Sequence, residues 1–561
     1  MRVLKPILYS TIAVALASCS SSGNVAKKAV PQGPNVVVDI PAKKAELTDT
    51  EKENWQHLDL ATDSIPGMSV YKAYEFLNGK KGVEVVVGVV DSGTDLKHED
   101  LKDVAWVNVD EIPGNGIDDD KNGYVDDING WNFLGDTYKE LLEYQRIMQN
   151  PSIADAETAA KVKEFYNKEL KDAKEGLSKL EQNSFTYGKI LEGIIKADEA
   201  FTKYFKKSDY TSEEILAIKD QPELENYIAI AKQVFGFGMS SLKEGKSELE
   251  GAVNYFTNKV QGNKDLISGE ILKKNYRATV GDNPEDIKDS PGYGNGNSGH
   301  STKDESHGTH VSGIIGATRG NGKGMEGVAN NVKIMAVRSV PDGDEYDKDV
   351  ALGIRYAVDN GAKVINTSFG KGYSPHKDWV YDAIKYAADN DVLIVNAAGN
   401  SSDDIDVVET YPNDTPDNKN EVADNFITIG AMSANNDKNL PATFTNYGKR
   451  NVDVFAPGVQ IYATTPDGEY GKKSGTSMAA PATAGVAALI RSYYPQLSAS
   501  QVKRILMNSG TKIDFEVIRP GSASRENPDG ELVPFSDLSV SGRVVNAYNA
   551  LRMADRIVNG K

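Results

Sequence analysis

Cysteine is almost absent from this sequence, which has one, Cys19, among 561 residues. A single cysteine excludes an intramolecular disulfide, so the folded chain must take its rigidity from packing or from bound metal. Histidine is also scarce, with six residues. Two of them, His307 and His310, fall within the stretch SHGTHVSGIIG, which marks that stretch as a place to look for chemistry.

Basic residues are outnumbered: 63 Lys and Arg stand against 81 Asp and Glu, a formal net charge of −18. This balance argues against nucleic acid as a partner, because a phosphate-binding surface needs clustered Lys and Arg. It suits a protein outside the cytoplasm and a protein that binds cations. Hydrophobic residues make up 39% and charged residues 26%, which is ordinary for a globular protein with a large core.

Long hydrophobic runs are missing after the N-terminal segment, so no later stretch is predicted to span a membrane. In that segment, Arg2 and Lys5 precede the apolar stretch ILYSTIAVALA, which is typical of a secretory signal. Cys19 follows in LASCSSSGN, which resembles a bacterial lipoprotein signal, where lipid is attached to the new N-terminal cysteine. We therefore predict that residues 1–19 are a lipoprotein signal peptide. The alternative is an incidental cysteine in a discarded peptide.

This interpretation places the mature protein outside the cytoplasm, anchored to a bacterial membrane through lipid on Cys19. The stretch SSSGN after the cysteine lacks an acidic cluster, so the outer membrane or a periplasmic face is the expected position. Residues 20–50 are rich in Ser, Lys, Pro and Ala with little periodicity. They are predicted to be a flexible tether between the lipid and the folded part.

The composition and periodicity of the rest of the chain change twice. Residues 51–135 and 276–556 contain β-branched runs that alternate with helical segments, which predicts an α/β fold with a mostly parallel sheet. Residues 136–275 instead hold long amphipathic stretches rich in Lys, Glu, Ala and Leu, and they are predicted to be an insertion of four or five helices. In parallel sheets, functional residues lie at the carboxyl ends of the strands.

Three stretches together carry a catalytic pattern. Asp91 ends a strand in VVDSGTD, His307 opens HGTHVSGIIG, and Ser477 lies in SGTSMAAPATAG before an apolar helix. A serine hydroxyl is a poor nucleophile, so it needs a base, and the base needs a carboxylate that holds its tautomer. The order Asp, His, Ser is that of subtilisin. Over roughly residues 53–135 and 276–556 the chain resembles the subtilisin-like serine peptidases.

The resemblance implies a three-layer α/β fold with a mostly parallel central sheet, interrupted here by the helical insertion. It also implies a serine endopeptidase that cleaves proteins or peptides through an acyl-enzyme intermediate and needs no cofactor for its chemistry. In the motif His-Gly-Thr-His the first histidine is the base, so His307 is assigned that role and His310 a structural one. Ser474 lies close to Ser477 but lacks the Met-Ala-Ala-Pro that follows Ser477.

The resemblance extends to the residues that bind the substrate. Asn400, in IVNAAGN, is expected to donate its side-chain amide to the oxyanion together with the backbone N–H of Ser477. The stretch NTSFG resembles the strand that pairs with the substrate backbone, and NAAG resembles one wall of the primary specificity pocket. The substrate contacts expected from these two stretches are Ser368, Phe369, Gly370, Ala398 and Gly399.

The acidic loop GIDDDKNGYVDDINGWNF predicts a calcium site with a structural role. Its oxygen-bearing residues alternate and are followed by a glycine and a backbone carbonyl, which is the first half of an EF-hand loop. Position twelve is Asn129 rather than glutamate, so Asp126 or Asp127 must supply the remaining carboxylate. The predicted ligands are Asp118, Asp120, Asn122, the carbonyl of Tyr124, and Asp127. The alternative is a solvated acidic loop. A second candidate, suggested by the resemblance, pairs Asp100 with the RGNGKG loop near Asn321.

Other classes of function fit the sequence less well. An inactive peptide-binding scaffold would usually have lost one of Asp91, His307, Ser477 or Asn400, and none is lost. A metallopeptidase of the His-Glu-x-x-His type is excluded because that motif is missing. A glycan-binding lipoprotein would need an additional β-rich module, for which the five residues after 556 are too few. For the insertion, a lid, a partner-binding surface and simple padding all remain open.

Overall fold

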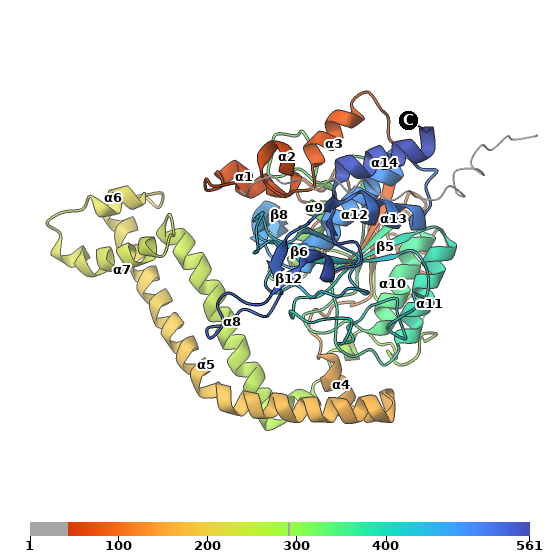
Figure 1. Cartoon of the computed structure of the whole chain (residues 1–561). Coiled ribbons are helices and arrows are strands. Elements are labelled where there is room, and N and C mark those ends of the chain that lie inside the picture. Colours follow the sequence, from red (N-terminus) through yellow and green to blue (C-terminus); the bar gives the residue numbers. More distant parts are fainter. Residues whose placement is uncertain (1–42, 290–291, 561) are drawn as a thin grey trace, which may run out of the picture. The chain divides into compact units, whose positions relative to one another are not determined.

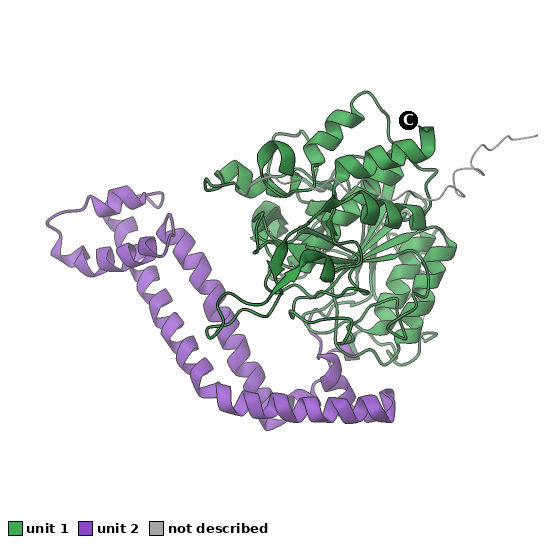
Figure 2. Cartoon of the chain, in the orientation of Figure 1, with its two compact units in different colours: residues 1–138, 279–561 green, residues 139–278 purple. Residues whose placement is uncertain are grey.

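The computed structural model describes residues 43–289 and 292–560 (Figure 1). Cys19, the predicted signal peptide and most of the predicted tether lie outside these residues. The chain divides into two compact units, residues 1–138 with 279–561 and residues 139–278 (Figure 2). The second unit begins and ends three residues later than the predicted insertion 136–275.

A nine-stranded sheet in the order β10-β13-β7-β6-β5-β4-β1-β3-β2 forms the centre of the first unit. All neighbouring pairs from β13 to β2 are parallel, and β10 alone pairs antiparallel, with β13. Most of these strands are buried along their whole length, as the near-continuous β-branched run at β1 predicts for that strand. The strands are β1 (Val85–Asp91), β2 (Gly130–Asn132), β3 (Val332–Arg338), β4 (Val364–Thr367), β5 (Leu393–Ala397), β6 (Phe426–Met432), β7 (Val454–Pro457), β10 (Thr511–Lys512) and β13 (Arg543–Val544).

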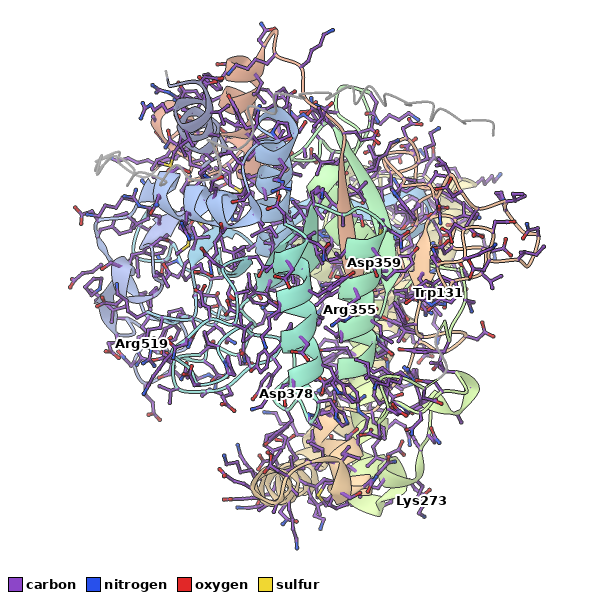
Figure 3. The ribbon with its side chains drawn as sticks, turned by 90° about the vertical axis from the view of Figure 1, so that its right-hand side faces the viewer. Trp131, Lys273, Arg355, Asp359, Asp378 and Arg519 are labelled. Atoms are coloured by element: carbon purple, nitrogen blue, oxygen red, sulfur yellow. The ribbon has the colours of Figure 1, made fainter. Side chains whose placement is uncertain are left out.

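Helices cover both faces of the sheet, so the first unit has three layers. One hydrophobic core joins the sheet to α9 (His307–Gly316), α12 (Thr476–Tyr493), α13 (Ala499–Ser509) and α14 (Ala547–Asn559). A second core joins the opposite face to α10 (Asp347–Asp359) and α11 (Lys377–Asp389). Figure 3 shows α10 and α11 side by side, with Arg355 and Asp359 on α10 and Asp378 on α11. The predicted three-layer α/β class is confirmed.

The N-terminal part of the described chain belongs to the first core. Trp55, Ile65 and Met68 are buried there, and α3 lies beside α14 (Figure 1). The short elements of this region are α1 (Asp49–Asn54), a 3₁₀ turn at Trp55–His57, α2 (Leu60–Asp63) and α3 (Val70–Leu77). Two hairpins complete the unit, β8 (Ile461–Thr465) with β9 (Glu469–Lys473) and β11 (Glu516–Ile518) with β12 (Leu532–Pro534).

The second unit is helical throughout, as its composition predicts. Its longest helix, α5, has 50 residues and packs along α8. Asp155 and Ser241 cap the N-termini of α5 and α8 through their side-chain oxygens. A small core around Ile194, Phe201 and Val234 joins α5 to α7. The α-helices are α4 (Glu143–Gln149), α5 (Ala156–Phe205), α6 (Ser212–Leu216), α7 (Glu225–Gly236) and α8 (Leu242–Ser268).

None of the helices in residues 43–289 and 292–560 combines the length and the apolar composition that a membrane span requires.

Candidate active site

Asp91 and His307 meet at the carboxyl edge of the sheet. Asp91 is the last residue of β1 and is fully buried, and His307 opens α9. The His307 Nδ1–H donates to Asp91 Oδ1 over 2.7 Å. A proton fixed on Nδ1 leaves Nε2 unprotonated in the neutral ring, so Nε2 can accept a proton.

A glycine allows this approach of α9 to β1. The backbone N–H of Gly308 donates to Ser92 Oγ over 3.0 Å, and the N–H of Ser92 donates to Asp91 Oδ1 over 2.7 Å. A Cβ atom on Gly308 would lie 2.4 Å from the carbonyl oxygen of Ser92, which is too close for any side chain. The glycine of the His-Gly-Thr-His motif is therefore required by the close packing of helix and strand.

His310 faces away from this pair. It is fully buried, and its Nε2 lies 3.1 Å from the carbonyl oxygens of both Ile461 and Gly471. Burial is the main cause that lowers the pKa of His310 to about 3. The ring is therefore neutral at ordinary pH, and its role is to hold the β8–β9 hairpin against α9.

Ser477 is brought to the same edge through β4. In the parallel register of β1 and β4, Val90 pairs with Thr367, so Asp91 and Ser368 leave the sheet side by side. The Ser477 hydroxyl donates to the carbonyl of Ser368 over 3.0 Å, and the Ser368 hydroxyl donates to the carbonyl of Ser477 over 3.0 Å. Ser477 is the second residue of α12, where unpaired backbone N–H groups surround it.

Asn400 lies beside the start of α12. Its Oδ1 accepts from the backbone N–H of Thr476 over 2.8 Å and from the Thr476 hydroxyl over 3.0 Å, which leaves its Nδ2 to donate elsewhere. A Cβ atom on Gly475 would lie 3.6 Å from Asn400 Nδ2 and 3.6 Å from the backbone nitrogen of Ser477. Two donors thus flank one small space that stays open because residue 475 has no side chain.

Thr476 and Gly475 were not singled out from the sequence as functional residues. Thr476 orients the amide of Asn400, and its hydroxyl also accepts from the N–H of Gly399 over 3.1 Å. Gly475 keeps the space between the two donors open. Both residues directly precede Ser477 in SGTSMAAP, so the signal for them was present in the motif that identified the serine.

A cavity of about 260 Å³ adjoins Ser477. Its lining includes four of the predicted substrate contacts, Phe369, Gly370, Ala398 and Gly399. Ser368, the fifth, is outside this lining and buried, and its side chain holds Ser477 instead. The cavity is large enough for one amino-acid side chain.

Three carboxylates lie together at the acidic loop, two from the loop itself and one from Glu111, which precedes it. This group differs from the set of ligands that the spacing predicts. Oxygen atoms of Glu111, Asp120 and Asp127 all lie within 4.8 Å of one another. Asp127 is fully buried, and desolvation raises the pKa of its carboxyl group above the ordinary value. Tyr356 donates to it over 2.6 Å. Like charges crowded in a buried position favour a bound cation, and carboxylate oxygens are the ligands that calcium prefers.

The other predicted calcium ligands shape the loop. The carboxylate of Asp118 accepts from the backbone N–H groups of Asn122 over 3.1 Å and Gly123 over 2.9 Å. The side-chain oxygen of Asn122 accepts from the N–H of Tyr124 over 2.8 Å, and the ring of Tyr124 packs edge-on against Tyr356. Glu111 was missed because it precedes the loop and has no place in the alternating pattern.

Asp100, the second predicted cation site, has several hydrogen-bond donors around its carboxylate. The buried carboxylate of Asp100 accepts from Asn321 Nδ2 over 2.5 Å, from the hydroxyl of Tyr470 over 2.9 Å and from the N–H of Met325 over 3.3 Å. The structure thus brings Asp100 and the loop of Asn321 together as predicted. The carboxylate of Asp100 thus accepts hydrogen bonds from these three residues.

Comparisons with known proteins match the part of the chain that contains the residues of this site. The sequence profile of the subtilase family matches residues 82–522. The chain is 34% identical over 227 residues to the cell wall-associated protease of Bacillus subtilis (strain 168), which covers 40% of this chain and 23% of that protein. It is 37% identical over 218 residues to subtilisin DY of Bacillus licheniformis, covering 38% and 73%. It is 37% identical over 208 residues to thermitase of Thermoactinomyces vulgaris, covering 37% and 68%.

A solved structure, that of a cold adapted subtilisin-like serine proteinase, matches with 28% identity and a TM-score of 0.34, covering 43% of this chain and 74% of that one. The alignments to the three relatives named above span about two fifths of this chain, and that to the cell wall-associated protease spans about a quarter of that relative.

Proposed function

This chain belongs to the subtilase family of serine peptidases, and we propose that it is an endopeptidase that works through Asp91, His307 and Ser477. The observation that carries the proposal is the 2.7 Å hydrogen bond from His307 Nδ1 to Asp91. It holds the imidazole in the tautomer that activates a serine, and the reciprocal bonds between Ser368 and Ser477 bring the serine to the same edge of the sheet.

The reaction follows from the roles of these atoms. The Ser477 hydroxyl turns from the Ser368 carbonyl to His307 Nε2, gives up its proton and attacks the substrate carbonyl carbon. The charge on the carbonyl oxygen is stabilised by the N–H of Ser477 and by Asn400 Nδ2. The protonated His307 then gives its proton to the leaving amine, and water hydrolyses the acyl-enzyme by the same steps.

Protein or peptide substrates are proposed to bind in extended form. Residues 368–370 directly follow β4, so their backbone groups are suited to pair with a peptide strand. One substrate side chain then enters the cavity lined by Phe369, Ala398 and Gly399. The scissile carbonyl lies at Ser477, which lines the same cavity.

A serine-reactive phosphonyl fluoride tests the proposed nucleophile. The purified protein should take up one label, on Ser477, because only an activated serine hydroxyl attacks phosphorus at neutral pH. The site is read by peptide mass mapping of the labelled chain. A folded protein that takes no label, or takes it on another serine, would contradict the proposal.

We also propose that Glu111, Asp120 and Asp127 hold a structural calcium ion. The ion would compensate two of the three negative charges and would take no part in peptide hydrolysis. A ligand that binds only the folded state adds about 2.7 kcal/mol to the free energy of unfolding at one hundred times its dissociation constant. Chelation should therefore lower the melting temperature, measured by calorimetry with and without added calcium.

Two variants distinguish the loss of a proposed cation ligand from the loss of another carboxylate in the same loop. Asp120→Asn should abolish the calcium response, and Asp118→Asn, which changes a carboxylate outside the group, should keep it. The response should also weaken in acid, because desolvation raises the pKa of Asp127 and protons then compete with the cation. If neither calcium nor chelator changes the melting temperature of the wild type, the three carboxylates do not form a structural calcium site.

The lipid anchor remains a proposal that rests on LASCSSSGN alone. Each methylene buried in a membrane adds about 0.8 kcal/mol, so several acyl chains hold a protein firmly. Fractionation of cells that make the wild type or Cys19→Ala should find the first in the membrane fraction and the second in the soluble extracytoplasmic fraction. Equal partitioning of both forms as soluble protein would mean that the signal is an ordinary cleaved one.

A further inference from the structure

A buried arginine lies next to the proposed catalytic aspartate. Arg338 ends β3, and the parallel register of β1 and β3 pairs it with Asp91. Its side chain is 1% exposed and is the largest fully buried side chain among the described residues. The mechanism above does not use it. A guanidinium removed from water needs charge compensation and acceptors for its five N–H groups.

Glu305 supplies the charge compensation. Arg338 Nε donates to Glu305 Oε1 over 2.5 Å, and Arg338 Nη2 donates to Glu305 Oε2 over 3.1 Å. This two-point contact fixes the carboxylate in plane with the guanidinium, which a single contact cannot do. The remaining acceptors are Asn132 Oδ1, Ser301 Oγ and the carbonyl oxygens of Gly135 and Thr137.

The carboxylate of Glu305 also accepts hydrogen bonds from the segment after Asp91 and from the segment before His307. Its Oε1 accepts from the N–H of Gly93 over 2.7 Å, and its Oε2 accepts from the N–H of Ser301 over 2.7 Å. Gly93 lies two residues after Asp91, and Glu305 itself lies two residues before His307. The segments pack closely there, because a Cβ atom on Gly93 would lie 2.5 Å from the carbonyl oxygen of Gly299.

We propose that Glu305 and Arg338 are positioning residues for the Asp91–His307 pair. The carboxylate joins the loop after Asp91 to the segment before His307, and the guanidinium fixes the carboxylate against the end of β3. Neither side chain is placed to touch the substrate. Glu305 and Arg338 together set the relative position of the Asp91 and His307 side chains, which must stay aligned through every turnover. The inference rests on the proposed triad.

Glu305→Gln is the first test, because it keeps the size of the side chain and removes its charge and one acceptor. Turnover should fall about tenfold to a hundredfold, the cost of misplacing catalytic groups by about 1 Å. The Michaelis constant should change less than twofold, because the substrate cavity is not involved. The acid limb of the pH profile of kcat/KM should move to lower pH, because a misplaced Asp91 stabilises protonated His307 less.

Asp282→Asn is the matched control. Asp282 pairs with Lys348 over 2.7 Å, and both side chains are fully buried. This variant also turns a buried, ion-paired acid into an amide in the same unit. It should lower the melting temperature as much as Glu305→Gln and leave turnover and the pH profile unchanged.

Arg338→Lys gives a second measurement if Glu305→Gln does not fold. Lysine keeps the positive charge but cannot make the planar two-point contact, so turnover should fall with an unchanged Michaelis constant. In the double variant the losses should not multiply, because both changes break one contact. Unchanged turnover and pH profile in either folded variant overturns the positioning role. A wild type that hydrolyses no peptide overturns the proposed function, and the inference with it.

Discussion

Ser477→Ala should reduce peptide hydrolysis by about a millionfold, a magnitude known from subtilisin itself. The change removes the hydroxyl that His307 and Asp91 are proposed to activate. The fold should persist, because the lost hydroxyl makes one hydrogen bond, to the Ser368 carbonyl, which contributes about 1 kcal/mol to stability. Hydrolysis of a chromogenic peptide and the melting temperature of the same sample check both statements.

Ser474→Ala is the matched control for that experiment. Ser474 lies three residues before Ser477 and is exposed, and its hydroxyl accepts from the backbone N–H of Gln460 over 2.9 Å. This variant should keep wild-type turnover. Activity that survives in Ser477→Ala and is lost in Ser474→Ala would reassign the nucleophile.

Asn400→Ala should lower turnover about a hundredfold to a thousandfold, or about 3–4 kcal/mol of transition-state stabilisation, again a magnitude known from subtilisin. The Michaelis constant should change little, because the amide donates fully only when negative charge develops on the carbonyl oxygen. Steady-state kinetics with one peptide substrate separates the two constants. A raised Michaelis constant with normal turnover would mean that Asn400 only binds the substrate.

Asn400→Asp refines that result. The Asn400 side-chain oxygen also accepts from the backbone and hydroxyl of Thr476, so the alanine variant removes a support of α12 as well as a donor. Aspartate keeps the acceptor and loses the donor. A loss of turnover in Asn400→Asp at least as large as in Asn400→Ala would assign the effect to the missing N–H donor, because the charge of aspartate beside the oxyanion adds a further penalty.

The sequence predicted the layers of the fold because local patterns encode them. Val85–Val90 is a β-branched run interrupted only by Gly88, and it forms a strand buried on both sides. The helical unit followed from its Lys, Glu, Ala and Leu content, but its ends were misplaced by three residues. Composition changes gradually along a chain, whereas the boundary at 138–139 depends on which contacts the backbone makes in space.

The site was predictable where a motif carries it and not where distant residues meet. Glu305 and Arg338 lie 33 positions apart, and Glu305 and Gly93 lie 212 positions apart, so no local spacing reveals their contacts. The acidic loop shows a different limit. An aspartate such as Asp118 can bind a cation or its own backbone N–H groups, and the alternating pattern is the same for both. In the folded loop Asp118 accepts from the N–H groups of Asn122 and Gly123, and Glu111, which no spacing marks, lies close to Asp120 and Asp127.

Residues 55–77 are built into the core of the first unit, which bears on where the N-terminus of this chain is cut. Trp55 Nε1 donates to the carbonyl of Val459 over 3.2 Å, and the carbonyl of Met68 accepts from the N–H of Ala547 over 2.8 Å. Removal of residues 55–77 would therefore expose the core under α14 and unfold the enzyme. We expect any maturation cut to fall before Trp55, and an N-terminal sequence read from the active protein would show where.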